Sequence, residues 1–155
     1  MRVTPRHPLL LITAVAILPL ALVGCGLEDT DADQAAAEDA VAKARERVEN
    51  YLDAMMAKDP SVGREQFCPV LHPSFEEAAT GPNGDFADHF TVTEVAITDV
   101  RPNDGRQEVS AAVTVNASGQ EGVINLRFAV AKEGDRWCIA DEQPTKPTAT
   151  PTAAP

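Results

Sequence analysis

Apolar residues follow three successive patterns along this chain of 155 residues. Residues 9–23 form a nearly unbroken apolar run, interrupted only by Thr13 and Pro19. Residues 35–59 place apolar side chains at steps of three and four, which is the spacing of one face of an α-helix. From residue 86 onward, apolar and polar residues alternate, as they do in strands with one buried face. The patterns predict a leader segment, then helix, then sheet.

The stretch at residues 35–59 predicts one long amphipathic helix. It is rich in strong helix formers, and Asp59-Pro60 is expected to end it. Asp31 and Gln34 resemble a capping pair ahead of the helix. The predicted buried stripe consists of Val41, Ala44, Val48, Tyr51, Leu52 and Met55. Most charged residues fall outside this stripe and are expected to face water.

Two short helices are expected next. Ser61 is placed to cap the first of them. Its expected buried residues are Val62, Phe67 and Cys68. Ser74 is placed to cap the second, which Gly81 should stop.

Four strands are predicted after the loop "GPNGD". The apolar parity changes between Val92 and Val95, which indicates a β-bulge near Thr93-Glu94. Turns are expected within "RPNDGR", "SGQEG" and "KEGD", and the last strand is "RWCIAD". The two clearest inward rows are Val109, Ala111, Val113 and Val115, followed by Ile124, Leu126, Phe128 and Val130.

Helices followed by a four-stranded antiparallel meander predict an α+β fold, with the first helix covering one face of the sheet. The helix ending "YLDAMMAKD", the following "FC" and the closing "RWCIA" resemble the nuclear transport factor 2-like (cystatin-like) domain of small exported actinobacterial lipoproteins. This resemblance implies a cone-shaped sheet, here expected over residues 34–141. The early strand usual between the helices of that family has no counterpart in the pattern.

The apolar run follows a short segment with Arg2 and Arg6 and no acid, as in a secretory signal. It is shorter than the roughly 20 apolar residues of a membrane-crossing helix, although an uncleaved anchor is the alternative. Leu22-Val23-Gly24-Cys25 resembles the bacterial lipobox. The resemblance implies that residues 1–24 are removed as a signal peptide and that Cys25 carries acyl chains, palmitate among them. The alternative is a cysteine that stands there by chance.

Acyl chains on Cys25 would hold the protein at the extracytoplasmic face of the cell membrane. Residues 25–33 are acidic and are expected to form a solvated tether. Residues 142–155 are rich in proline and threonine and are expected to form a disordered tail.

The charge of the chain excludes one class of partner. It has 13 basic and 24 acidic residues, a net charge of −11. Loss of Arg2 and Arg6 with the signal would leave the mature chain more negative still. Such a surface repels phosphate backbones, so no nucleic-acid partner is expected.

Two cysteines remain once Cys25 is assigned to lipid. Cys68 and Cys138 form an even pair in an exported chain, and we expect them to form a disulfide. The alternative is two separately buried thiols. With no Cys-x-x-Cys and only His72 and His89 past the leader, neither a metal site nor a cofactor is expected.

Catalysis in relatives of this fold depends on an Asp or His inside the cone that transfers a proton. The two inward rows contain no such side chain, and the helical stripe offers only Tyr51. Asp85, Asp88 and His89 are placed near the mouth of the first strand, and Glu94 at the proposed bulge. Carboxylates near loops are most often simply solvated. We therefore expect no catalytic residue and no enzyme.

The last strand offers a partner surface under one of two arrangements. If Cys138 meets Cys68 on the helix-covered face, Trp137 and Ile139 emerge on the open face, where they would favour a protein partner or a homodimer. If Cys68 instead reaches round the sheet edge, Trp137 belongs to the core.

The expected function is that of a lipid-anchored extracytoplasmic lipoprotein with a non-catalytic binding or interaction domain. One alternative is a carrier of small apolar ligands that uses the cone cavity. Another is an enzyme of the isomerase or dehydratase kind.

Overall fold

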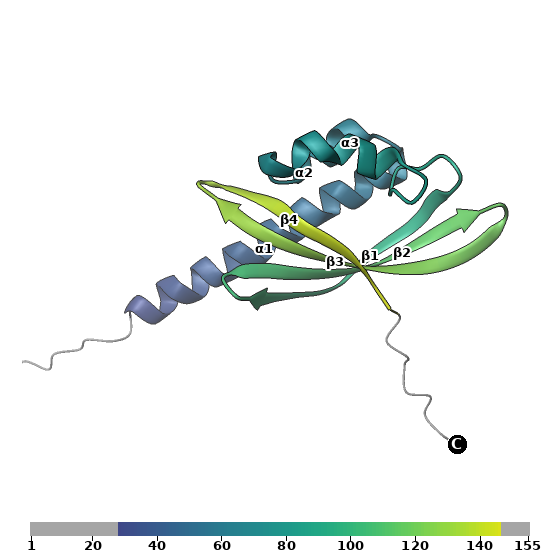
Figure 1. Cartoon of the computed structure of the whole chain (residues 1–155). Helices are drawn as coiled ribbons and strands as arrows, with labels where there is room; N and C mark the ends of the chain where they lie inside the picture. Colours follow the sequence, from purple (N-terminus) through teal and green to yellow (C-terminus); the bar gives the residue numbers. More distant parts are fainter. Residues whose placement is uncertain (1–27, 147–155) are drawn as a thin grey trace, which may run out of the picture.

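The computed structural model describes residues 28–146. Three α-helices and a short 3-10 helix precede four strands, which form one antiparallel sheet in the order β1-β2-β3-β4. The elements are α1 (Glu28–Ala57), α2 (Pro60–Gln66), η1 (Pro69–Leu71), α3 (His72–Thr80), β1 (Thr91–Asn103), β2 (Arg106–Ala117), β3 (Gln120–Glu133) and β4 (Arg136–Thr145). The expected α+β class and meander are confirmed, in an arrangement consistent with a cystatin-like cone. Figure 1 shows α1 lying along one face of the twisted sheet.

The predicted stripe of α1 is buried against the sheet. Ala44, Val48, Tyr51, Leu52 and Met55 are at most 2% exposed, and Val41 is half-buried. The helix nevertheless starts at Glu28, inside the expected tether. Several acids stand in its first turns, where carboxylates favour the positive end of the helix dipole. Residues 31–39 are all exposed, and this half of α1 extends beyond the sheet (Figure 1).

The short helices start differently from the prediction. Asp59, not Ser61, caps α2: its carboxylate accepts hydrogen bonds from the backbone N–H groups of Ser61 and Val62. Pro60 then occupies the first turn. A backbone N–H at this position has no acceptor within the helix, so proline loses no hydrogen bond there. Val62 is 42% exposed, contrary to expectation.

Helix α3 ends before Gly81 as predicted, but Ser74 does not cap it. The helix begins at His72, with Pro73 in its first turn. The Ser74 hydroxyl donates instead to the carbonyl of Leu71, 3.2 Å away.

The sheet has the predicted bulge and inward rows. The β1–β2 register shifts between Val92 and Glu94, and shifts again between Ile97 and Asp99. On the helix-covered face Val109 stands opposite Phe128, and both side chains are fully buried. Strand β4 continues to Thr145, past the expected domain end at residue 141, because its last residues keep pairing with β3.

Tyr51 occupies the centre of the core. Its ring lies edge-on to Phe67, Phe86 and Phe128, with centroids 5.1, 5.9 and 5.7 Å away. These contacts join α1, the segment after α2, the loop before β1, and β3. One aromatic side chain thus packs against every layer of the domain.

The route of the chain past β4 decides where the cysteines lie. Phe67 forms a parallel bridge with Ile139, and the Cys68 N–H donates to the Ile139 carbonyl at 2.9 Å. This short pairing extends the sheet edge. Phe67 enters the core, so Cys68 turns to the other side and meets Cys138 there. The structure joins these two cysteines in a disulfide.

The proposed partner face at Trp137 and Ile139 is therefore wrong in its placement. Ile139 is 0% exposed and belongs to the core, and Trp137 is half-buried against that core. The physical reason is that Cys68 reaches Cys138 round the sheet edge, which leaves the neighbours of Cys138 on the inner face.

No helix within residues 28–146 combines the length and the apolar character that a membrane crossing requires. The predicted signal peptide and the lipid-bearing Cys25 lie outside the described residues.

Candidate functional site

A cleft of about 470 Å³ lies between α3 and the parts of β3 and β4 next to it. One wall comes from the helices and the other from the sheet, and most of the side chains on both are apolar. The apolar lining residues include Phe67, Leu71, Phe75, Ala78, Ile124 and Leu126. This is the volume range of small-molecule sites in proteins.

Three polar side chains meet at one wall of this cleft. The Tyr51 hydroxyl, from α1, donates a hydrogen bond to Asp85 Oδ2 at 2.5 Å. Glu142, from β4, lies close enough to both groups to interact with them electrostatically. All three residues line the cleft.

The loop after α3 holds Asp85 in place. Gly84 N–H donates to the Gly81 carbonyl at 2.9 Å, and Phe86 N–H donates to the Ala79 carbonyl at 2.8 Å. A Cβ on Gly84 would lie 2.2 Å from the Ala79 oxygen, so only glycine permits this close approach. The loop therefore folds tightly onto the end of α3 and turns Asp85 towards Tyr51.

A bulge in the β3–β4 pairing turns Glu142 inward. Val130 pairs with Ile139, but Ala129 pairs with Asp141, so one extra residue stands on β4. Beyond the bulge Glu142 is opposite Phe128, on the helix-covered face. Without the extra residue the strand alternation would point Glu142 to the open face.

The cleft shifts the protonation of two of these groups. Burial raises the pKa of Glu142 well above its usual range, and the neighbouring Asp85 carboxyl raises it further. Burial also raises the pKa of Tyr51, with further contributions from Glu142 and Asp85. Tyr51 thus stays a hydrogen-bond donor, and the cleft favours the protonated form of Glu142.

The charge of the cleft has one sign. Its lining contains the carboxyl groups of Asp85 and Glu142 and no lysine, arginine or histidine, while Asp141 borders it but turns its carboxylate to Gln143 on the open face. An anion in the cleft would find no basic side chain to pair with.

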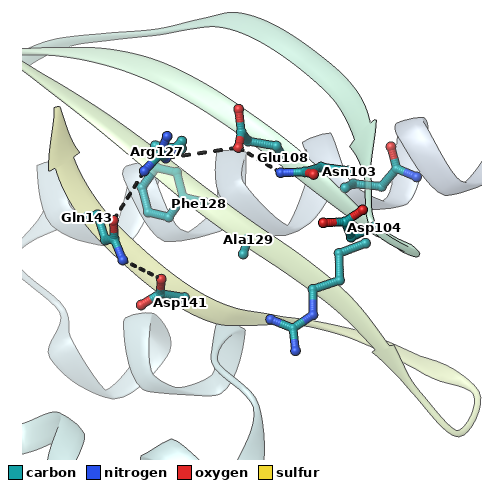
Figure 2. A pocket seen from close by; sticks show the side chains of 10 residues that line it. Asn103, Asp104, Glu108, Arg127, Phe128, Ala129, Asp141 and Gln143 are labelled. Atoms are coloured by element: carbon teal, nitrogen blue, oxygen red, sulfur yellow. Dashed lines mark hydrogen bonds and ion pairs between the residues drawn. The ribbon is translucent and has the colours of Figure 1, made fainter.

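A second hollow, of about 500 Å³, lies on the open face of the sheet, away from α1. Figure 2 shows Arg127 there between Glu108 and Gln143. Arg127 donates to Gln143 at 3.2 Å, and Gln143 donates to Asp141 at 2.8 Å. The hollow is thus lined by side chains that already bind one another.

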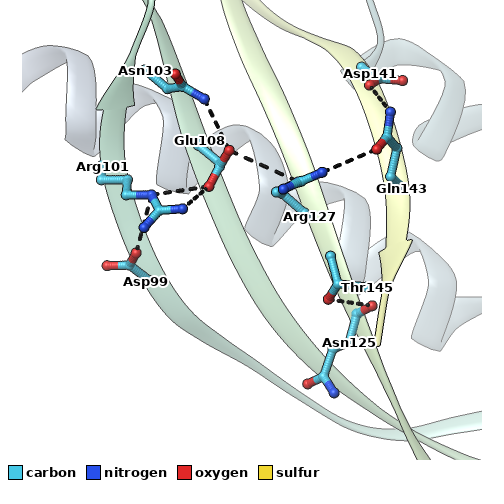
Figure 3. Close-up of polar contacts among 9 residues, drawn as sticks. All are labelled: Asp99, Arg101, Asn103, Glu108, Asn125, Arg127, Asp141, Gln143 and Thr145. Carbon is cyan, nitrogen blue, oxygen red and sulfur yellow. Dashed lines mark hydrogen bonds and ion pairs between the residues drawn. The ribbon is translucent and has the colours of Figure 1, made fainter. Parts of the chain in front are cut away.

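Glu108 is the centre of this network (Figure 3). Arg101 donates to it through Nε at 3.0 Å and also through its terminal nitrogen, and Asn103 donates at 3.1 Å. The hydrogen bonds from Arg101 lower the pKa of Glu108. The network satisfies its own charges, so we treat it as a feature that orders the sheet surface.

The other residues singled out from the sequence lie outside the cleft. Asp88, His89 and Glu94 are exposed, and His89 lies edge-on to Phe90 with centroids 5.2 Å apart. Of the residues named for their chemistry, the cleft contains Tyr51 and Asp85. Glu142 was missed, because it follows the expected end of the domain.

Among residues 28–146, one group of potential metal ligands gathers within 4.8 Å: Cys68, Cys138 and Glu133. Both cysteines belong to the disulfide, so neither offers a free thiolate.

No protein-family model matches this chain, and no curated protein matches it. Several solved structures are similar to part of it, among them the following three. A five-substitution variant of the NTF2-like protein Rd1NTF2_05 is 17% identical, with a TM-score of 0.44 over 66% of this chain and 96% of its own. A SEC-C motif containing protein from Rhodopseudomonas palustris is 15% identical, with a TM-score of 0.47 over 61% and 72%. The intermembrane space region of the chloroplast protein ARC6 is 12% identical, with a TM-score of 0.46 over 67% and 95%.

Proposed function

We propose that the protein is a bacterial lipoprotein that binds a small ligand without changing it. Cys25 would anchor it to the extracytoplasmic face of the cell membrane. A nuclear transport factor 2-like cone would hold the ligand in the cleft between α3 and the β3–β4 strands. The observation that carries this proposal is the cleft itself, with its apolar walls and the polar cluster of Tyr51, Asp85 and Glu142.

The anchor is supported by the order of features at the start of the chain. A basic segment, an apolar run and Leu22-Val23-Gly24-Cys25 follow one another as in lipoprotein precursors. The Ala-rich and Asp-rich composition agrees with the actinobacterial origin that the resemblance implies. The disulfide between Cys68 and Cys138 fits an oxidising compartment.

A substitution that fills the cleft tests whether the ligand binds there. Ala78 is exposed on α3 and lines the cleft, so Ala78→Phe should fill the space without entering the core. The full chain in phospholipid nanodiscs should bind the neutral apolar dye Nile red in a saturable manner, after subtraction of empty nanodiscs. Ala78→Phe should abolish this binding. Ala35→Phe, on the exposed half of α1, should leave it intact. Equal binding by the two variants would remove the cleft as the ligand site.

Proton-transfer catalysis is a second candidate, favoured by the raised pKa of Glu142 beside Tyr51. The two functions differ in what happens to the ligand. A binding protein returns its ligand unchanged after prolonged incubation, whereas an enzyme releases an isomer or a dehydrated product, which mass spectrometry and NMR would identify.

A further inference from the structure

The cleft combines acidic groups at one wall with an apolar interior. Asp85 and Glu142 meet at one wall, and Asp141 lies beside Glu142 in sequence and also lines the space. The lining includes no basic side chain. A ligand that complements this wall must bring positive charge or several hydrogen-bond donors, because ionised carboxylates only accept.

The rest of the cleft suits a hydrocarbon or aromatic body. Phe67 and Phe75 lie together with ring centroids 5.1 Å apart, and both line the space. Ile124 on the opposite wall is 41% exposed, which is unusual for a large apolar side chain at an inward position. Aromatic faces also attract cations, so the walls and the carboxyl groups favour the same kind of molecule.

We propose that the cleft binds an organic amine, with its ammonium group held between Asp85 and Glu142 and its apolar body against Phe75 and Ile124. This inference rests on the proposed function, since it requires that the cleft holds a ligand. It goes further by naming the chemical class of that ligand. The net charge of −11 on the chain also favours the approach of cations.

The protonation of Glu142 links binding to pH. The groups near it are Tyr51 from α1, Asp85 from the loop after α3 and the adjacent Asp141, whose carboxylate accepts a hydrogen bond from Gln143 on the open face. Helix α3 contributes no titratable side chain to the lining. Wherever Glu142 is protonated, an ammonium group that pairs with it displaces that proton to solvent. Binding should therefore release a proton, and affinity should rise with pH until the ligand amine itself loses its charge.

Three matched probes test the charge preference. Phenethylamine, phenylethanol and phenylpropanoate share one ring and one spacer but end in an ammonium, a hydroxyl and a carboxylate. Calorimetric titration of the full chain in nanodiscs, with empty nanodiscs as the blank, measures each affinity. We expect phenethylamine to bind about tenfold or more tightly than phenylethanol, since a hydrogen bond to a charged group adds that much.

The possible results separate the two proposals. If phenylethanol binds as tightly as phenethylamine, or phenylpropanoate binds most tightly, the amine inference is overturned while the cleft remains a ligand site. If none of the three binds, the amine inference fails as well, and the Nile red titration decides separately whether the cleft is a ligand site.

Glu142→Gln keeps the size of the side chain and removes its charge. It should reduce the preference for phenethylamine severalfold, since only Asp85 then remains to pair with the ammonium group, and leave phenylethanol binding unchanged. Glu133→Gln, which changes an exposed carboxylate at the far end of β3, should alter neither affinity. An unchanged preference in Glu142→Gln would contradict the inference.

The unaltered chain provides a second measurement that does not depend on the folding of a variant. Titrations with phenethylamine in buffers of different ionisation enthalpy report the protons released on binding. Net release at mildly acidic pH is expected, and binding without proton release would exclude Glu142 as the partner of the ammonium group.

Discussion

Glu142 is an unusual side chain to find beside an aromatic core, because a carboxyl group loses its hydration there. It is tolerated because the polar groups of Tyr51 and Asp85 lie beside it and because its protonated form is favoured there. The same environment makes it sensitive to pH, and this sensitivity can be measured without any ligand.

Glu142→Gln should change the pH dependence of stability. The pKa of Glu142 in the folded chain is raised above the ordinary value of 4.5. The stability that Glu142 contributes is therefore complete below that value and is lost as pH rises towards the folded pKa. Glutamine has no proton to lose, so the free energy of unfolding of the variant should gain on the wild type by about 1.4 kcal/mol per pH unit in this interval. Urea unfolding at a series of pH values measures the difference. A constant difference would show that Glu142 titrates normally.

At the scale of residues, the sequence predicted two members of the site but not that they lie together in one cleft. Tyr51 stands out on the helical stripe and Asp85 at the mouth of β1, yet they are 34 residues apart and meet only because Gly84 lets the loop close. Glu142 depends on a bulge opposite Ala129 and Val130. No residue type marks that bulge, so the alternation pattern alone could not turn the side chain inward.

The turns that join the strands rely on backbone conformations that few residues adopt. Between β1 and β2, Asp104 and Gly105 have φ of 48° and 75°, and between β2 and β3, Ser118 and Gly119 have φ of 53° and 81°. Two successive positive φ values define the tight hairpin turn that matches the twist of the sheet. The predicted turn sequences "NDG" and "SG" supply residues that tolerate this region.

Gly105→Ala should destabilise the protein by about 1 kcal/mol, since an alanine at positive φ meets its own backbone. Space is not the reason, because nothing lies within 4 Å of a Cβ at this position. Gly122 in β3 is equally open and does not have a positive φ, so Gly122→Ala serves as the matched control. Chemical unfolding of both variants measures the contrast. Equal effects would show that the turn conformation is not what glycine supplies.

The disulfide ties the segment after α2 to the edge strand across a separation of 70 residues. Closing a loop of that length limits the unfolded chain and contributes up to about 4 kcal/mol on the chain-entropy model. The double substitution Cys68→Ala and Cys138→Ala should lower the free energy of unfolding by about 2–4 kcal/mol, measured with urea. Adding a reductant should destabilise the unaltered chain by a similar amount and leave the double variant unaffected.

At the scale of elements, the periodicity of apolar residues predicted the buried faces correctly, whereas the capping residues did not predict where the helices begin. The buried stripe of α1 and the rows of β2 and β3 follow directly from steps of three and four and from alternation. The start of α2 depended on a choice between Asp59 and Ser61, which stand two residues apart and are both good caps. The start of α1 was placed too late, because acidic residues that suit a tether also suit the first turns of a helix.

At the scale of the whole molecule, the proposed lipid anchor makes the position of the protein in the cell depend on Cys25. Cys25→Ser removes the sulfur that would accept lipid. We expect the variant to move from the membrane fraction to the soluble extracytoplasmic or culture fraction, because a chain without acyl groups loses the apolar area that holds it. Fractionation followed by immunoblotting measures this, with Cys68→Ser as a control that keeps its lipid. Equal membrane retention of Cys25→Ser and the unaltered chain would rule out the lipid anchor.

The early start of α1 has a mechanical consequence for an anchored protein. Only Gly26 and Leu27 separate Cys25 from the first helical residue, and Ala44 is the first fully buried position described along the helix. A helix rises 1.5 Å per residue, so the exposed residues 31–39 alone form a stiff rod of about 13 Å. If the N-terminal end of α1 were held at the membrane through Cys25, this part of the helix would act as a lever arm. Each change in its tilt would carry the mouth of the cleft, as one piece, nearer to the bilayer or farther from it.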